Sequence, residues 1–404
     1  MSAALPKLRP VEAFPVEVDG QQLICLHDPL QYATESLALA PPAFFILTLL
    51  DGAHAMVDVQ AAFIERFGAI VSADEIRELL AALDQHHFLE SPRFTARRAE
   101  VTAAFRGAPV RRAAHAGTSY PADRPGLVAH LDGFFTTVGN GAGAGRVRGI
   151  IAPHIDLRVG GTGYGHAYHA LRDVADGTRF VVLGTAHYPG ATFFTATRKD
   201  FATPLGTVAT DGAFLDRLAA RVPHDLYADE LLHRTEHAVE FQVVMLQHVL
   251  GGRRDFTIVP LLVTSFHEMV GTRSSPLSDH RVSSFLAALR ETIAEDPRPT
   301  VLIAGVDFAH VGAKFGDAEG LAPELLAGAE AKDRELIAAL EVGDAERFFA
   351  TTAADGDRTR ICGLSAMYAF TTLLDGAPGR LLHYDRTCDE NTRSSVSYAA
   401  LAYS

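Results

Sequence analysis

Short runs of branched apolar residues alternate with amphipathic helical stretches over most of the chain after residue 111. The apolar runs have the length and composition of buried strands, and they cover residues 147–155, 179–187, 255–263, 300–310 and 394–404. The stretches with helical spacing cover residues 163–175, 211–222, 236–250, 282–295 and 329–341. This alternation is typical of an α/β fold. We predict a layered domain with a largely parallel sheet over residues 112–404.

The first 90 residues follow a different pattern. Two short strand-like segments flank Asp19-Gly20, a dipeptide that favours tight hairpin turns. Three helical segments follow, and the last of them opens at Ser72 and Glu75, which have the spacing of a capping box. A hairpin with three helices predicts a small winged-helix-like domain at 1–90. Residues 91–111 have no clear hydrophobic period, and we interpret them as a linker.

The charge of the chain excludes one large class of partners. The net charge is −13, and residues 1–100 hold 14 acidic and 7 basic side chains. Nucleic-acid binding needs a basic surface that neutralises phosphates, so we expect no nucleic-acid partner.

The apolar segments and the cysteines indicate a compartment. The longest apolar run, residues 37–50, is too short for a bilayer span and contains two prolines. The N-terminal segment lacks the unbroken apolar stretch of a secretory signal. The cysteines at positions 25, 362 and 388 are too scattered for a disulfide framework. We predict a cytoplasmic protein that does not contact a membrane.

Histidines stand at the ends of three predicted strands. They are His154, His187 and His310, and Asp307 precedes the last of them by three residues. In open α/β sheets, ligands bind outside the carboxyl ends of the strands. A single histidine at a strand end is more often a surface residue than a ligand, but three on one edge of a sheet favour a site.

Two further groups are candidates for the same site. Cys362 precedes a helical pattern, where the helix dipole stabilises a thiolate and favours metal binding or nucleophilic attack; the alternative is a small buried apolar residue. Glu236 and Glu240 are four residues apart on one helix face, with His237 beside the first. The alternative for this pair is a solvated face, and the paired histidines of a zincin motif are missing.

From residue 112 to residue 404, the sequence resembles the MEMO family, whose bacterial members include the AmmeMemoRadiSam system protein B. The matching motifs occur in family order: "RRAAHAGTSYPAD", "IIAPHIDLRVGGTGYGHAYHAL", "VVLGTAH", "TPLGTVATD", "EHAVEFQ", "FTIVPLLV", "DFAHVGAKF", "ICGLSAMYA" and "SSVSYAALAY". The resemblance implies a fold similar to class III extradiol dioxygenases, which hold non-haem iron with two histidines and one carboxylate.

The resemblance also implies roles for individual residues. The metal positions of the family fall on His154, His187 and Cys362, and the acid/base position falls on His310, with Asp307 as its neighbour. A thiolate in place of a carboxylate is a softer ligand, so the implied cofactor is one Fe(II) or copper ion, with zinc as an alternative. This chain has Asp156 where the family usually has Gly, so Asp156 is a candidate to orient His154 or to bind the metal.

The first domain resembles the PqqD-like domains that bind peptides for radical-SAM maturases, in "ILTLLDGAHAMVDVQAAF" and "IRELLAALDQHHFLE". This resemblance implies a peptide or a radical-SAM protein as the partner of the first domain.

Three functions follow from these observations. The first hypothesis is a mononuclear metal-dependent redox enzyme of the dioxygenase-like kind, in which Glu236, His237 and Glu240 line the pocket. The second is a non-catalytic peptide- or metal-binding partner of a radical-SAM system. The third is a zinc hydrolase, which ranks below the other two. The sequence leaves open whether the protein is an enzyme.

Overall fold

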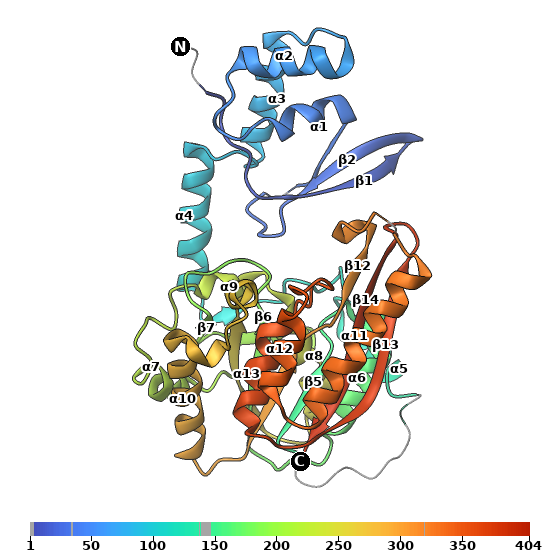
Figure 1. Cartoon of the computed structure of the whole chain (residues 1–404). Helices are drawn as coiled ribbons and strands as arrows, with labels where there is room; N and C mark the ends of the chain where they lie inside the picture. The colour runs from blue at the N-terminus through green and yellow to red at the C-terminus, as the bar shows by residue number, and fades with distance from the viewer. Residues whose placement is uncertain (1–3, 34, 137, 139–146, 319) are drawn as a thin grey trace. The chain divides into compact units, whose positions relative to one another are not determined.

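The structure is a computed structural model that describes residues 4–33, 35–136, 138, 147–318 and 320–404. It divides into two compact units, unit 1 at Met1–Gly107 and unit 2 at Ala108–Ser404 (Figure 1). The predicted boundaries at 90 and 112 stay predictions.

Unit 1 contains the predicted hairpin and the predicted helices. Its antiparallel sheet and its helices are β1 (Glu12–Val18), β2 (Gln21–His27), β3 (Leu37–Leu39), α1 (Pro41–Thr48), α2 (Met56–Phe67), α3 (Ala73–Gln85) and α4 (Pro92–Gly107). Asp19 and Gly20 have φ angles of 51° and 75°, the left-handed geometry of a tight hairpin turn. The Ser72 hydroxyl accepts from the Glu75 backbone at 3.1 Å, which confirms the capping box. The winged-helix assignment stays a prediction.

The interpretation of residues 91–111 as a linker stays a prediction, but most of this segment is helical. Helix α4 occupies Pro92–Gly107. Three apolar side chains spaced seven and four residues apart, Phe94, Val101 and Phe105, are buried along it. Only three apolar residues mark the buried face of this helix, and basic residues separate them, so the helical period is not evident from the sequence.

Unit 2 is built around one large sheet. The strands of unit 2 are β4 (Val110–Arg111), β5 (Gly149–Ala152), β6 (Thr178–Thr185), β7 (Phe194–Ala196), β8 (Asp200–Thr203), β9 (Gly206–Val208), β10 (Phe256–Val263), β11 (Thr300–Gly305), β12 (His310–Gly312), β13 (Gly379–Asp389) and β14 (Ser394–Tyr403). Of these, β4, β8 and β9 form a separate small sheet. The α-helices of unit 2 are α5 (Arg124–Gly133), α6 (Leu157–His169), α7 (Gly212–Ala219), α8 (His237–Leu250), α9 (His267–Thr272), α10 (His280–Ala294), α11 (Pro323–Glu341), α12 (Ala345–Ala353) and α13 (Leu364–Leu374). Its short 3₁₀ helices are η1 (Glu230–Arg234), η2 (Pro276–Ser278) and η3 (Ala313–Phe315).

The strand order in the large sheet is β12-β14-β5-β11-β6-β10-β7, and β13 pairs with β14. The four central strands β5, β11, β6 and β10 are parallel, which confirms the α/β fold. The outer strands β14, β13, β12 and β7 are antiparallel. The resemblance to extradiol dioxygenases stays a prediction. Among the helices in the described residues, none has both the length and the apolar composition needed to cross a bilayer.

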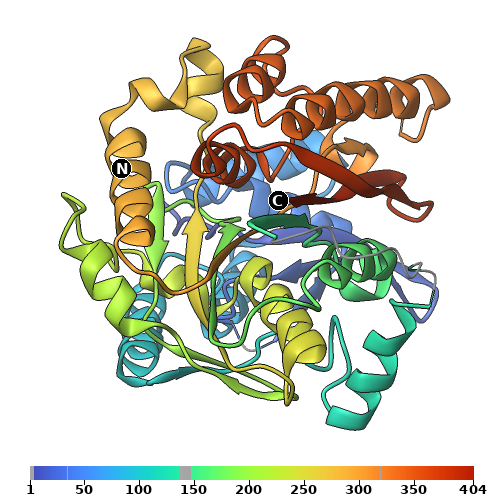
Figure 2. The same cartoon turned by 90° about the horizontal axis from the view of Figure 1, so that it is seen from below.

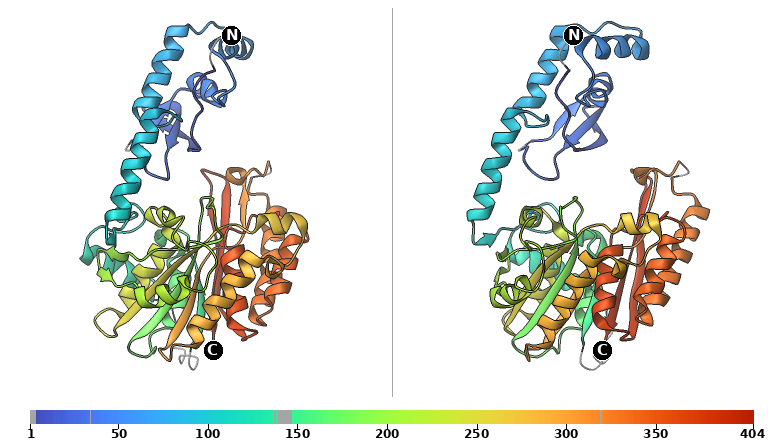
Figure 3. Two further views of the ribbon diagram at one scale, coloured as in Figure 1. Left: turned by 90° about the vertical axis from the view of Figure 1, so that its left-hand side faces the viewer. Right: turned by 60° about the vertical axis from the view of Figure 1, so that its left-hand side comes forward.

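The parallel strands are buried on both faces, as their unbroken apolar runs indicate. Helices lie on both sides of the sheet (Figures 2 and 3). Ile151, Val181 and Leu183 pack into one core with α10, α12 and α13. Ile150 and Val182 pack into the other core with α6 and α8.

Two glycines let the start of α8 approach the carboxyl ends of the strands. A Cβ atom at Gly305 would lie 2.7 Å from the carbonyl oxygen of Ala238, and one at Gly184 would lie 2.9 Å from Val239. Larger residues at these positions would push the helix outward. The glycines therefore bring the first residues of α8 next to the residues that follow β5, β6 and β11.

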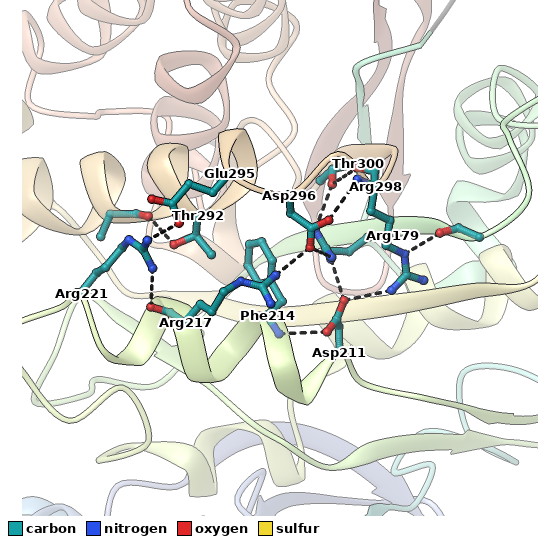
Figure 4. A network of polar contacts seen from close by, with 12 residues as sticks. Arg179, Asp211, Phe214, Arg217, Arg221, Thr292, Glu295, Asp296, Arg298 and Thr300 are labelled. Atoms are coloured by element: carbon teal, nitrogen blue, oxygen red, sulfur yellow. Dashed lines mark hydrogen bonds and ion pairs between the residues drawn. The ribbon is translucent and has the colours of Figure 1, made fainter.

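A buried arginine fixes the opposite, amino-terminal end of β6 (Figure 4). Arg179 donates from Nε to Asp211 at 2.7 Å and from a terminal nitrogen to Asp296 at 2.6 Å. Arg298 binds the same Asp211 carboxylate at 3.0 Å. Because a buried charge is tolerated only when it is paired, this network holds β6 in place.

A buried carboxyl group joins α11 to the two C-terminal strands. Asp333 Oδ2 accepts from the Tyr384 hydroxyl at 2.9 Å and from the Ser397 hydroxyl at 2.5 Å. Burial raises the pKa of Asp333 to about 6. The native state therefore binds the proton of the Asp333 carboxyl group more tightly than the unfolded state does. The stability that this proton contributes is present below about pH 4 and is lost as the pH rises through about 6.

Asp333→Asn is expected to remove this dependence. Relative to the variant, the wild-type chain should lose on the order of 3 kcal/mol of unfolding free energy between pH 4 and pH 7. Urea unfolding followed by circular dichroism at several pH values measures the difference, with Asp375→Asn at an exposed position as the control. A wild-type-to-variant difference that stays constant with pH would contradict the prediction.

Candidate metal centre

Three histidines meet at the carboxyl ends of the parallel strands. His154 follows β5, His187 follows β6, and His237 is the first residue of α8. One ring nitrogen of each lies within 4.8 Å of the others. The ring centroids of His154 lie 4.9 Å from His187 and 5.2 Å from His237. Two of these histidines lie at strand ends, the third lies at a helix start, and the group of three can hold a metal ion.

Hydrogen bonds fix the orientation of the two strand-end imidazoles. His154 Nδ1 lies 2.9 Å from the carbonyl oxygen of Gly305, and His187 Nδ1 lies 3.0 Å from Glu236 Oε1. Each acceptor requires a proton on Nδ1, so Nε2 of a neutral ring carries the free lone pair. This is the arrangement in which proteins present histidine to metals.

Glu236 connects the histidines to one another. Its buried carboxylate accepts from the backbone of His187 at 3.0 Å and from Ala238 at 3.1 Å, and it lies 3.3 Å from His237 Nδ1. Burial favours the neutral acid, but the charge and hydrogen bonds of His187 hold the pKa of Glu236 well below its usual range. Glu236 is therefore an anion that caps α8 and contacts two of the three imidazoles.

Cys362 lies beside both His154 and His187. Its Sγ is 3.2 Å from His154 Nε2 and 3.8 Å from the carbonyl oxygen of Asp307. It stands just before α13, as the sequence indicates, but burial raises the pKa of its thiol, so the expected dipole-stabilised thiolate is not favoured without a cation. A bound metal would supply the missing positive charge.

Protonation differs among the imidazoles. Burial lowers the pKa of His154 to about 3 and that of His237 well below its usual value. Burial also opposes protonation of His187, but the Glu236 carboxylate raises the pKa of His187 well above its usual value. His154 and His237 are therefore neutral at pH 7, with lone pairs available to a cation.

Asp307 and His310 lie beside these donors. Asp307 Oδ1 accepts from the backbone of His154 at 3.0 Å, and burial raises the pKa of Asp307 to about 6. His310 Nδ1 lies 3.0 Å from the carbonyl oxygen of Phe308, and burial lowers the pKa of His310 although Asp307 opposes this. A carboxyl group and a neutral imidazole thus lie close to the metal donors.

The two remaining candidates have other contacts. Asp156 caps α6 and forms an ion pair with Arg158 at 2.8 Å rather than with His154. Glu240 is fully buried and pairs with Arg111 and with the Tyr120 hydroxyl. Glu236 and Glu240 are both buried, so the alternative of a solvated helix face is wrong.

The donor set suits a transition metal. It offers imidazole nitrogens and one sulfur, which divalent first-row metals and Cu(I) prefer, whereas calcium and magnesium prefer oxygen ligands. His154 Nδ1 and His187 Nδ1 are both engaged, which leaves their Nε2 atoms for an ion, although His187 would first release the Nε2 proton that Glu236 favours. From the sequence, His237 was predicted only as a pocket residue. Its position at a helix start beside Glu236 was the feature that could have indicated a place among the metal donors.

Comparison with known proteins identifies relatives of this chain. The model of the Memo-like protein family matches residues 111–402. A MEMO1 family protein of Aquifex aeolicus is 30% identical over 98% of this chain and 99% of its own length. One of Thermus thermophilus is 28% identical over 85% of this chain and 97% of its own length, and one of Pyrococcus furiosus is 32% identical over 51% and 67%.

The family match begins at residue 111, so the PqqD-like resemblance of unit 1 and the AmmeMemoRadiSam subtype stay predictions. The matched range contains every residue of the site described above. Since the family model covers nearly all of unit 2 and the Aquifex relative aligns along almost the whole chain, the chain belongs to the Memo-like family.

Proposed function

We propose that unit 2 is a mononuclear metal-dependent redox enzyme that uses iron or copper. The observation that supports this most is the convergence of two oriented imidazoles, His154 and His187, on the thiol of Cys362. These three residues would hold the ion, in line with the family resemblance. When bound, such an ion exchanges electrons with substrate or oxygen and polarises a bound oxygen atom.

His310 is the proposed acid/base residue. Its Nδ1 is occupied by the carbonyl oxygen of Phe308, so Nε2 is the atom that takes a proton from the substrate. The neighbouring Asp307 favours the imidazolium that then forms, because the two side chains interact electrostatically. Asp307 also accepts from the backbone of His154, which holds the two parts of the site together.

We also propose that the protein is cytoplasmic. Cys25, Cys362 and Cys388 are free thiols. A reducing compartment keeps thiols in this state and available to a metal.

Metal content tests the proposal. We expect the full-length chain, purified without oxygen, to contain near-stoichiometric iron or copper by plasma mass spectrometry. His154→Ala, His187→Ala and Cys362→Ala should each lose most of it, because each removes one ligand from a three-ligand site. His280→Ala, at an exposed helix start, is the matched control and should retain the metal.

Two results would overturn the proposal. Wild-type chain that is free of metal and does not take up added Fe(II), Cu(I) or Zn(II) would exclude a metal centre. Stoichiometric zinc with no iron or copper would instead favour the hydrolase, in which the ion activates water.

A further inference from the structure

We infer that the C-terminal end of α8 forms a second site, which binds a small phosphorylated sugar or polyol. A cavity of about 580 Å³ lies there, lined by α5, by β9 and by the segment that follows α8. The 14 residues of α8, each with a rise of about 1.5 Å, separate this cavity from the metal donors by about 20 Å. The inference therefore goes beyond the proposed function and does not depend on a bound metal.

Three arginines line the cavity, and two of them have unused guanidinium groups. Arg124 donates to the carbonyl oxygen of Leu205 at 3.1 Å. Among the residues that the structure describes, the side chains of Arg253 and Arg254 have neither a hydrogen-bond partner nor an ion-pair partner. Their backbones are fixed, because both amides donate to the carbonyl oxygen of Leu250, at 2.9 and 3.0 Å. Planar guanidinium groups bind phosphate through paired hydrogen bonds, so this edge of the cavity suits a phosphate group.

The cavity carries an excess of positive charge. Its charged side chains are the three arginines and two carboxylates, Asp132 and Asp255. Burial lowers the pKa of His248 in the same wall, the charge of Asp132 opposes this, and the charge of Arg253 adds to it, so the imidazole is neutral at pH 7. The chain as a whole carries a net charge of −13 and repels anions in general. A positive cavity on such a chain therefore favours a specific anionic ligand.

The rest of the wall suits hydroxyl groups. Gln247 accepts from the Thr203 hydroxyl through Oε1, and its amide nitrogen lies 3.9 Å from the point where a Cβ atom at Gly206 would stand. This nitrogen and the Thr207 hydroxyl can donate to a ligand, whereas the two aspartates can only accept. A sugar hydroxyl does both, so it matches this mixture. Sites for apolar ligands are instead lined mainly by hydrophobic side chains.

The test is isothermal titration calorimetry of the full-length chain with ribose 5-phosphate, glucose 6-phosphate and glycerol 3-phosphate. Inorganic phosphate and free ribose are the comparisons. We expect at least one of the three esters to bind at least about tenfold more tightly than inorganic phosphate, because the hydroxyl groups add hydrogen bonds. Free ribose should give no heat, because it lacks the anion.

Two variants separate the parts of the site. The double variant Arg253→Gln/Arg254→Gln should weaken ester binding at least about tenfold, because it removes charge-assisted hydrogen bonds. Asp132→Asn should weaken ester binding but not the binding of inorganic phosphate. Arg290→Gln, which removes an exposed arginine from α10 on the opposite face of the sheet, is the matched control and should bind as the wild-type chain does.

Three results would overturn the inference: no binding of any of the three esters, equal ester binding by the double variant and the wild-type chain, or inorganic phosphate that binds as tightly as the esters. The metal content of the double variant should equal that of the wild-type chain. A chain that binds the esters but no metal would overturn the proposed function alone.

Discussion

Glu240→Ala is expected to lower the unfolding free energy of unit 2 by about 3 to 5 kcal/mol, because it leaves a buried arginine without its partner. Arg111 is 1% exposed and Glu240 is fully buried. Arg111 also donates to the carbonyl oxygens of His233 and Glu236, both at 2.9 Å. The pair therefore ties the first strand of unit 2 to the helix start that carries the site.

The same carboxylate satisfies other donors that the variant would orphan. The backbone amides of Ala114 and His115 donate to it at 2.9 and 3.0 Å, and so does the Tyr120 hydroxyl. Urea unfolding by circular dichroism measures the loss. Glu291→Ala, which removes an exposed carboxylate from α10, should cost about 1 kcal/mol or less. Equal losses of unfolding free energy in the two variants would mean that the buried ion pair contributes no more to stability than an exposed carboxylate does.

The double variant Arg111→Ala/Glu240→Ala separates the charge from the packing. Removing both charges leaves no uncompensated ion, so we expect the double variant to lose less stability than the sum of the two single variants. Additive losses would show that the pair contributes through its separate contacts.

Glu236→Ala is expected to weaken metal binding about 10- to 100-fold, the usual effect of removing a group that orients metal-binding histidines. Without the carboxylate, His187 Nδ1 loses its acceptor, and His237 Nδ1 loses the charged oxygen that lies 3.3 Å from it. Either ring can then rotate or change tautomer, so its free lone pair no longer points to the ion. Glu236→Gln, which keeps one acceptor oxygen, should show a smaller loss.

Chelator competition with the metal found in the purified protein measures this effect. Asp156→Asn is a matched comparison, because Asp156 is also an acidic helix cap close in sequence to His154, one of the proposed ligands, but binds Arg158. We expect its affinity to match that of the wild-type chain. If Asp156→Asn lost as much affinity as Glu236→Ala, Asp156 would have the orienting role that the sequence left open.

The part of the site that lies at strand ends was predictable from the sequence. His154 and His187 each follow an unbroken apolar run, and parallel strands place their carboxyl ends on one edge. The burial of Glu240 was not predictable in this way. It depends on Arg111, which is 129 residues away in sequence, and no local pattern reports such a contact.

As with the site, only part of the fold was predictable from the sequence. The strands with continuous apolar runs were found, whereas strand β13 was missed. Most residues of β13 are half-buried or exposed, so its sequence has no buried stripe to reveal it. The antiparallel direction of β14 was also not predictable, because direction depends on which strand lies beside it rather than on its own residues.

The place of β14 in the sheet bears on how the protein folds during synthesis. Residues 394–403 lie between β12 and β5, and the backbone of Ser397 exchanges hydrogen bonds with Phe308 and Ala309 next to His310. The ribosome makes this segment after every proposed ligand. A nascent chain can therefore form unit 1 early, but it can close the sheet of unit 2 only when the last strand has emerged. Until then the edge of β5 is exposed to pairing with other chains.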